Sequence, residues 1–224
     1  MAVAATDRWA TFDCYGTLID WNRGLRTALA ALWPEADADH LLARYHEIEP
    51  RVQAGRGVSY RQVLAETLTR LAEAEGLVVP AGRGDALGAS LPSWPPFPET
   101  AATLAALRER GWRLGVLSNT DPAFLDASLA VIGVPVDARV VASQIGSYKP
   151  AVAHWDRFFR RTGADRTRHV HVAASLFHDV EPCAALGLRC VWINREGEVS
   201  DVPRSGELPD LRGLPDLLER LVPA

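Results

Sequence analysis

Short apolar runs recur along the chain and predict the strands of a sheet. Five runs have strand length: residues 9–12, 113–118, 138–143, 169–174 and 189–194. Stretches with helical spacing separate the last four runs, near 122–132, 151–163 and 179–187. This alternation is typical of parallel sheets, because parallel neighbours need a long crossover connection. The pattern therefore predicts an α/β fold.

About 80 residues with helical patterning separate the first predicted strand from the second. A connection of this length is too long for a loop in a compact domain. The proline-rich stretch SWPPFPET, residues 93–100, ends it. We therefore expect a sheet-containing core domain of residues 1–20 and 98–224, and a helical domain of residues 21–97 inserted above the strand ends.

Polar side chains follow the predicted strands at their carboxyl ends. Asp13 ends the first strand, Ser118 the second, Lys149 follows the third and Asp179 the fourth. Ligands of open parallel sheets bind at this edge. A carboxylate that a fixed lysine keeps ionised suits a nucleophile, so Asp13 beside Lys149 is the candidate. The hydroxyls of Thr17 and Ser118 could hold the attacking group in place.

Four short motifs, FDCYGTLID, LSNT, SYKP and ASLFHD, occur in this order around the helical stretch. Together they resemble the four motifs of the haloacid dehalogenase superfamily, and the resemblance covers nearly the whole chain. It implies a Rossmann-like parallel-sheet core with a helical cap inserted after the first strand. It also implies a covalent intermediate on Asp13.

Two departures separate this chain from the magnesium-dependent phosphatases of that superfamily. Tyr15 stands where those enzymes carry a second Asp that protonates the leaving group, and Ala174 stands where an Asp helps to hold magnesium. A halide leaves as a stable anion and needs neither group. The departures therefore resemble the 2-haloacid dehalogenase branch, for which we expect no cofactor and no metal.

The resemblance to this branch implies a mechanism for small 2-haloalkanoic acids. Asp13 would displace the halide in an SN2 step and form an ester. Water, assisted by Asp179, would then hydrolyse the ester to release a 2-hydroxy acid, while Lys149, Ser118 and Thr17 hold the carboxylates and the developing oxyanion.

Contacts to the substrate and halide are predicted by the same resemblance. They are Tyr15, Arg44, Asn119, Trp155, Ser175 and His178. Arg44 aligns with an arginine of the family's cap, and Trp155 replaces a tyrosine in the pocket wall. Asn119 either contacts the halide or caps the following helix. His178 either supplies a donor or base, or caps the helix after it.

Three other functions stay open at this stage. A phosphatase of small phosphate esters lacks its general acid here. A ring-opening hydrolase of the azetidine-2-carboxylate type would use the same nucleophile on a C–N bond. A non-catalytic protein of the same fold would not need Asp13, Lys149 and Asp179 together.

Composition and charge narrow the classes of partner. Hydrophobic residues make up 48% of the chain and the formal net charge is −4, so binding to nucleic acid is disfavoured. No apolar run reaches the roughly 18 residues that span a bilayer, and a cytoplasmic protein without membrane contact is expected. A homodimer stays open.

The cysteines and two strand histidines have structural interpretations. Three cysteines without CxxC spacing suggest neither a disulfide framework nor structural zinc, and Cys183 and Cys190 are expected to be buried. His169 and His171 alternate on one strand, where core positions are favoured over a metal pair.

Overall fold

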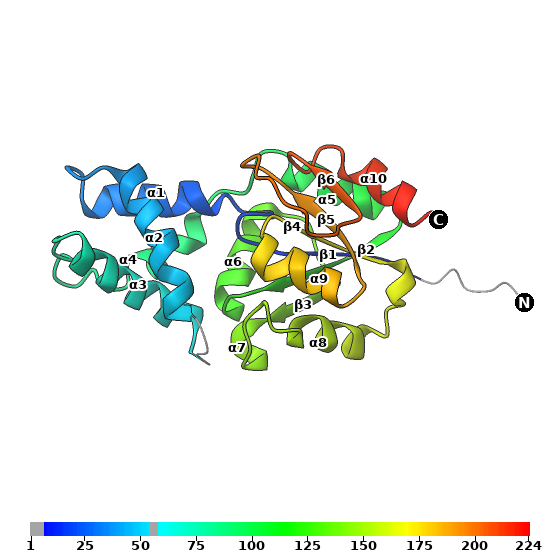
Figure 1. Cartoon of the computed structure of the whole chain (residues 1–224), viewed down its shortest axis with the longest axis horizontal. Helices are drawn as coiled ribbons and strands as arrows, with labels where there is room; N and C mark the ends of the chain where they lie inside the picture. The colour runs from blue at the N-terminus through cyan, green and yellow to red at the C-terminus, as the bar shows by residue number, and fades with distance from the viewer. Residues whose placement is uncertain (1–6, 54–57) are drawn as a thin grey trace, which may run out of the picture.

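The computed structural model describes residues 7–53 and 58–224, and its centre is a parallel sheet (Figure 1). The six strands are β1 (Arg8–Phe12), β2 (Trp112–Ser118), β3 (Ala138–Val141), β4 (His169–Ala173), β5 (Arg189–Ile193) and β6 (Gly206–Leu208). Their order is β3-β2-β1-β4-β5-β6. The strand order reverses at β1, so the crevice beyond its carboxyl end is the expected ligand site. The predicted α/β fold is confirmed.

The sheet differs from the predicted one at two places. β6 was not predicted, because its three residues are not fully buried and form no apolar run. The predicted strand 138–143 is too long, since Ala142 and Ser143 already belong to the short helix α7 (Ala142–Ile145). Each difference concerns a strand near an edge of the sheet, where burial imposes the weakest pattern.

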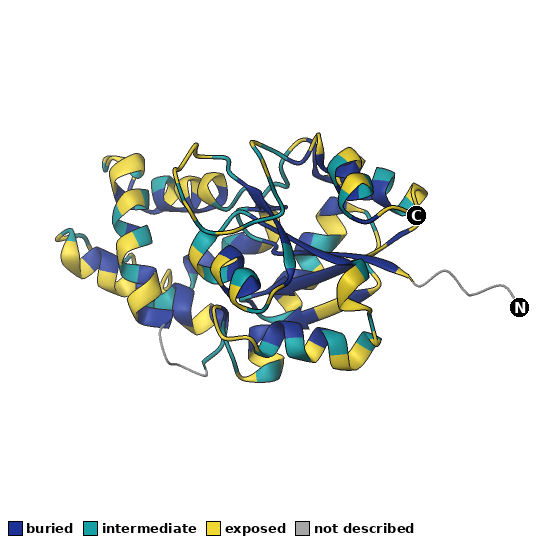
Figure 2. Cartoon of the chain, turned by 45° about the vertical axis from the view of Figure 1, so that its right-hand side comes forward, coloured by how far each residue is buried: buried dark blue, intermediate teal, exposed yellow. Residues whose placement is uncertain are grey.

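Helices cover both faces of the sheet, and Figure 2 shows that the strands between them are mostly buried. α5 (Thr100–Glu109) and α10 (Leu214–Leu221) lie on one side, and α8 (Ala153–Thr162) lies on the other (Figure 1). α6 (Pro122–Ile132) has the predicted bounds. The predicted helix 179–187 is a π-helical turn at Leu176–Val180 followed by α9 (Glu181–Ala185). Cys183 and Cys190 are buried, as predicted.

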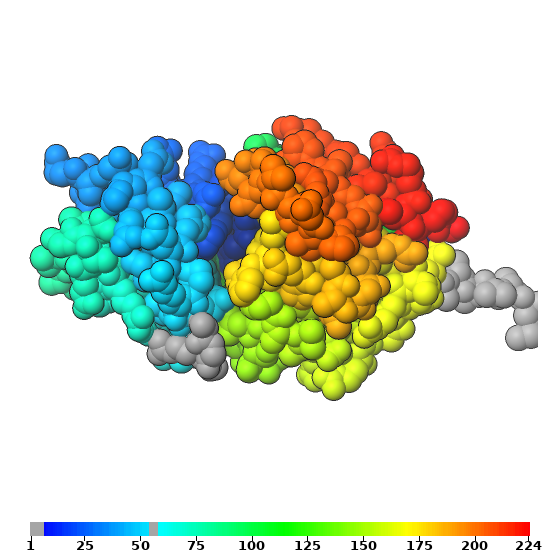
Figure 3. Space-filling view, in the orientation of Figure 1, coloured from blue at the N-terminus to red at the C-terminus, as the bar shows by residue number. Residues whose placement is uncertain are grey.

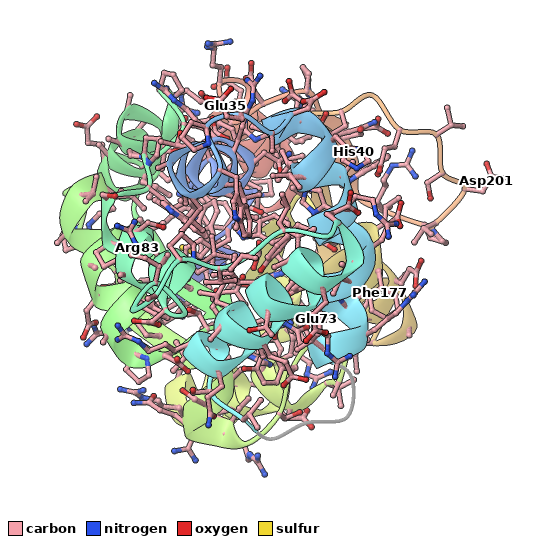
Figure 4. The ribbon with its side chains drawn as sticks, turned by 90° about the vertical axis from the view of Figure 1, so that its left-hand side faces the viewer. Glu35, His40, Glu73, Arg83, Phe177 and Asp201 are labelled. Atoms are coloured by element: carbon pink, nitrogen blue, oxygen red, sulfur yellow. The ribbon has the colours of Figure 1, made fainter. Side chains whose placement is uncertain are left out.

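The helices between β1 and β2 gather at one end of the molecule. They are α1 (Trp21–Leu32), α2 (Ala38–Gln53), α3 (Tyr60–Ala74) and α4 (Ala86–Ser90). α2 packs against α1 and α3, and α4 contacts both of those helices as well. Figure 4 looks from this end and shows the four helices in front of the sheet.

Several hydrogen bonds fix this helical segment to the strand ends. The chain leaves and re-enters the sheet side by side, with a bridge between Ile19 and Pro96. The Asp121 carboxylate, at the start of α6, accepts from the backbone N–H groups of Tyr60 at 2.9 Å and Arg61 at 3.0 Å. These N–H groups belong to the first turn of α3 and have no partner within the helix. Asp121, which follows β2, therefore caps a helix of the segment between β1 and β2.

Close packing between α1 and Trp94 requires a glycine. A Cβ atom at Gly24 would lie 2.3 Å from the Trp94 ring, well inside contact distance. We expect Gly24→Ala to lower the free energy of unfolding by about 1 to 3 kcal/mol, because Trp94 must shift within a packed interface. Urea denaturation measures the change. Gly84→Ala is the control, since a Cβ there meets no atom within 4 Å and should change stability by less than about 0.5 kcal/mol.

Candidate active site

Asp13 is held at the carboxyl end of β1 by two side chains. Its Oδ1 accepts from Lys149 Nζ at 2.8 Å and its Oδ2 accepts from Thr17 Oγ1 at 3.1 Å. The Thr17 oxygen in turn accepts from the Ala174 N–H at 3.0 Å. Both carboxylate oxygens are therefore oriented, and Asp13 is buried but still lines a cavity.

Lys149 joins the two acids of the site. Its Nζ donates to Asp13 at 2.8 Å, to Asp179 at 2.6 Å and to the Leu117 carbonyl at 3.0 Å. An ammonium group has three protons, so these acceptors use all of them. Burial would lower the pKa of Lys149, but the two carboxylates raise it, and the side chain is a fixed cation.

A chain of buried hydrogen bonds continues from Asp179 into the sheet. Asp179 Oδ1 accepts from His171 Nε2 at 2.9 Å, and His171 Nδ1 lies 2.8 Å from Thr11 Oγ1. The Thr11 oxygen also lies 2.7 Å from His169 Nε2. Asp179 Oδ2 has no partner among the described residues. The chain fixes one oxygen of Asp179 and leaves the other available.

The surroundings of Asp13 and Asp179 stabilise the ionised carboxylates to different degrees. Burial would raise the pKa of Asp179, but Lys149 and His171 lower it below its usual range. Burial raises the pKa of Asp13, and the Lys149 ammonium opposes this rise. Asp179 is therefore the more firmly ionised of the pair.

A cavity of about 1090 Å³ opens above these residues and contains both acids in its lining. The strand ends supply Asp13, Ser118 and Asp179 to its floor, and α2 supplies His46 and Glu49. Figure 3 shows a hollow between α2 and the segment after β5, the light-blue and orange surfaces. The cavity thus lies between the strand ends and the helical insert.

Ser118 and Asn119 follow β2 but have different surroundings. Ser118 Oγ is buried, lines the cavity and has no hydrogen-bond partner among the described residues. The Asn119 side chain accepts from the Lys149 N–H at 2.6 Å and donates to the Lys149 carbonyl at 3.0 Å and, more weakly, to Gln53 at 3.4 Å. Asn119 lines the cavity and also holds the backbone of Lys149. The sequence analysis expected a halide contact or a helix cap and did not include this contact.

Ser175 and His178 form one unit at the start of the π-helical turn. The Ser175 hydroxyl accepts from the His178 backbone N–H at 3.1 Å and lies 3.0 Å from Nδ1 of the same ring. The Ser175 hydroxyl either donates to Nδ1 or accepts from Nδ1–H, so this contact fits both tautomers of the neutral ring. Burial lowers the pKa of His178, which favours the neutral ring. Both residues line the cavity.

Tyr15 presents its ring, rather than its hydroxyl, to the cavity. The hydroxyl lies 3.1 Å from Ser128 Oγ on α6, and burial raises the pKa of Tyr15. A phenol whose oxygen is engaged in this way is poorly placed to protonate a leaving group. The side chain therefore replaces the second acid of the phosphatase motif with an apolar wall.

Arg44 does not reach the cavity, so the structure contradicts its predicted contact with substrate. Its guanidinium pairs with Glu75 at 2.8 Å and with Glu47, one helical turn further along α2. His40 shares Glu75 and lies at the outer surface in Figure 4. The buried face of α2 runs through Tyr45 and Glu49, about 100° of helical rotation away from Arg44.

Trp155 is also placed differently from the prediction. It is fully buried in the apolar layer between the sheet and α8, and it is absent from the cavity lining. Its ring meets His171 edge-on at 5.4 Å between centroids. Trp155 therefore packs beneath the His171–Asp179 pair and cannot form the pocket wall.

Three residues at the site were missed by sequence reasoning. Arg195, after β5, pairs with Glu99 at 2.8 Å and donates to the Thr17 carbonyl at 3.0 Å. Glu49 lines the cavity from α2, and His171, expected only as a core residue, contacts Asp179. Glu49 faces the cavity because of the phase of α2, Arg195 is placed by the loop after β5, and the His171–Asp179 contact joins β4 to the turn that follows it. The sequence contains no motif for any of the three.

The oxygen donors at this edge do not fit a magnesium site. Asp13 and Asp179 both accept from the Lys149 ammonium, and Ala174 has no oxygen in its side chain. Magnesium usually binds to one or two carboxylates and completes its octahedron with water, and here the Lys149 cation already occupies the position between the two acids. In residues 7–53 and 58–224 no group of three or more His, Cys, Asp or Glu side chains could hold a metal ion.

Known proteins resemble this chain over most of its length. The family model described as haloacid dehalogenase-like hydrolase matches residues 8–187. The chain belongs to this family. A (S)-2-haloacid dehalogenase of Pseudomonas sp. (strain YL) is 26% identical, with 93% of each chain covered. A glyceraldehyde 3-phosphate phosphatase of Methanothermobacter thermautotrophicus is 30% identical over 45% of this chain and 46% of its own.

A solved structure agrees with this assignment at the level of the fold. The L-2-haloacid dehalogenase RSc1362 superposes with a TM-score of 0.86, at 23% identity, over 96% of this chain and 99% of its own. The family assignment makes the protein a hydrolase, as the sequence resemblance implied. Among the described helices, none is long and apolar enough to cross a membrane.

Proposed function

We propose that this hydrolase removes halide from small 2-haloalkanoic acids and releases 2-hydroxy acids, without a metal. The observation that carries the proposal is the environment of Asp13, an acid oriented by Lys149 and Thr17 at the floor of a cavity, with Tyr15 rather than an acid two residues after it. The similarity to a (S)-2-haloacid dehalogenase over 93% of the chain supports the same reaction.

In the first step Asp13 is the nucleophile. One carboxylate oxygen attacks C2 of the substrate from the side opposite to the halogen, the C–O bond forms and the halide leaves with the bonding electrons. Ser118 Oγ, and His178 in the tautomer with its proton on Nε2, are donors available for the substrate carboxylate. The product of this step is an ester of Asp13.

In the second step water cleaves the ester at the Asp13 carbonyl carbon. Asp179 Oδ2, which has no partner among the described residues, takes a proton from the water. The Lys149 ammonium beside the carbonyl stabilises the oxyanion that forms. The C–O bond to Asp13 breaks, the alcohol oxygen receives the proton, and the 2-hydroxy acid leaves.

The helical segment completes the cavity in this proposal. Residues 21–97 would act as a cap domain over a Rossmann-like core of residues 1–20 and 98–224. The cavity lining includes His46 and Glu49 from α2 and Tyr60 from α3, which supports the assignment of this segment as a cap. Asp121 and Tyr148 hold the first turn of α3 and the Val58 carbonyl over the strand ends.

The test of the reaction is halide release from 2-chloropropionate and chloroacetate in the presence of EDTA. Single turnover in ¹⁸O-water should leave the label in Asp13 rather than in the product, because the alcohol oxygen comes from the carboxylate. Label found directly in the hydroxy acid would contradict the ester. Phosphate release from monoesters that requires added magnesium, with no halide release, would favour a phosphatase instead.

His171 should affect the second step through Asp179. We expect His171→Leu to lower kcat by about 10- to 100-fold with little change in KM, because Asp179 loses the bond that orients it. The ester on Asp13 should accumulate and be detectable by mass spectrometry. His171→Gln, which keeps a donor, should recover part of kcat, and an equal loss in both variants would indicate a purely structural role.

A further inference from the structure

Glu49 is a buried acid in the cavity that the proposed reaction does not use. The residue is only 5% exposed and lies on the buried face of α2. One carboxylate oxygen accepts from Gln53 Nε2 at 3.2 Å, and no Lys, Arg or His of the described residues forms an ion pair with it. Burial without a cation raises the pKa of Glu49 to about 7. A buried carboxylate of this kind is costly unless a ligand pairs with it.

The cations that line the same cavity are already neutralised. Lys149 lies between Asp13 and Asp179, as described above. Arg195 pairs with Glu99 at 2.8 Å, and Arg212 pairs with Asp210 at 2.7 Å. The cation that the family resemblance implied on α2, Arg44, faces outward. The helical side of the cavity therefore offers an acid where an anion-binding pocket would need a cation.

Aromatic rings line the same cavity as Glu49. Tyr15 and Tyr60 are stacked with 6.2 Å between ring centroids, and both line the cavity together with Trp21. Burial raises the pKa of the Tyr60 hydroxyl, and the Tyr45 and Glu49 side chains add to the rise. Aromatic faces attract cations, and a neighbouring carboxylate adds to this attraction.

We propose that Glu49, with the rings of Tyr15, Trp21 and Tyr60, binds a positively charged nitrogen of the substrate. The preferred substrates are then acids with an amino or quaternary ammonium group. The carboxylate lies at the strand ends and the cationic nitrogen below α2. The inference rests on the proposed function for the reaction, 2-halo acid hydrolysis, while binding of the nitrogen can be measured without any turnover.

The binding test uses pairs of acids that differ only in charge at the distal end. Calorimetry compares 3-aminopropanoate with butanoate, 4-aminobutanoate with pentanoate, and 5-aminopentanoate with hexanoate. Each pair exchanges an ammonium for a methyl group of similar size. For at least one length the wild-type protein should bind the amino acid about tenfold more tightly or better, which corresponds to one ion pair with a desolvated cation.

Two variants on the same helix distinguish the pocket from the general charge of the protein. Glu49→Gln should abolish the preference for the ammonium or reverse it. Glu47→Gln makes the same charge change on the outer face of α2, where Glu47 pairs with Arg44, and should keep the preference. Equal affinity within every pair, or a preference that survives Glu49→Gln, would overturn the inference.

Halide release separates failure of the inference from failure of the proposed function. The substrates are 2-chloro-4-(trimethylammonio)butanoate and its uncharged analogue 2-chloro-5,5-dimethylhexanoate, which has a tert-butyl group at the same place. A higher kcat/KM for the charged acid supports both proposals. Release without preference supports dehalogenation and overturns the cation site. A binding preference without release from either acid keeps the cation site and overturns dehalogenation.

Discussion

Halide release should fall by at least about 10³-fold when Asp13 is replaced by Asn, because the amide cannot form the ester intermediate. The measurement is the initial rate of halide release from 2-chloropropionate, followed to long times. The substitution keeps the size of the side chain and an oxygen that can accept from Lys149 or Thr17, so the fold should persist. Urea denaturation of the variant checks this point.

Slow deamidation could restore the acid at position 13 and imitate residual activity. Asp13→Ala is therefore measured beside Asp13→Asn, since the alanine cannot regenerate a carboxylate. Both variants should be equally inactive when freshly prepared. A rate within tenfold of the wild-type rate in both would exclude Asp13 as nucleophile and would redirect the search to other cavity residues.

Replacing Lys149 by Met should produce the largest loss of stability, about 3 to 5 kcal/mol at pH 7. The change leaves Asp13 and Asp179 buried beside each other without the cation that both accept from. Their charges repel, and neither acid is in water. Urea denaturation of Lys149→Met and wild type gives the difference directly, and halide release should also be lost.

The pH dependence of this loss follows from the two acids. In Lys149→Met the pKa values of Asp13 and Asp179 should lie above their unfolded values, so the folded state binds more protons and gains stability as the pH falls from 7 toward 4. In the wild type, burial would raise the pKa of Asp179, but Lys149 and His171 lower it. This lowered pKa stabilises the folded state at pH values above the unfolded pKa near 4, and the stabilisation is lost at lower pH. The difference between the two proteins should therefore shrink on acidification.

A double variant checks the electrostatic origin of the effect. Lys149→Met with Asp179→Asn leaves one buried carboxylate instead of two and should be more stable than Lys149→Met alone. If the double variant is less stable by the sum of both single losses, packing rather than charge explains the effect.

Much of the fold and the floor of the site could be predicted from the sequence. Buried parallel strands impose nearly continuous apolar runs, and β1, β2 and β4 were visible for this reason. The carboxyl ends of neighbouring strands meet at one edge, so residues that follow these runs had to approach each other. Asp13, Ser118 and Asp179 lie there, and Lys149 joins them from the loop after α7.

The walls of the cavity could not be predicted in the same way. Alignment with the family directed attention to Arg44, yet the rotation of α2 turns Arg44 outward and Glu49 inward. Trp155 was assigned to the pocket by its distance from Lys149 along the chain, but α8 buries it under the sheet. Asn119 donates to the backbone carbonyl of Lys149, which is 30 residues away along the chain. The sequence around either residue does not indicate this contact.

The sequence by itself determined the α/β class, the helical stretch between the first two strands and the acid, hydroxyl and lysine residues at the strand ends. These features follow from local periodicity and from the common direction of parallel strands, which act over a few residues at a time. Only the tertiary structure decided that Glu49 rather than Arg44 faces the cavity and that His171 supports Asp179. Helix rotation and side-chain pairing between distant segments depend on the packing of the whole molecule, because each is chosen by the total burial and hydrogen bonding that it allows.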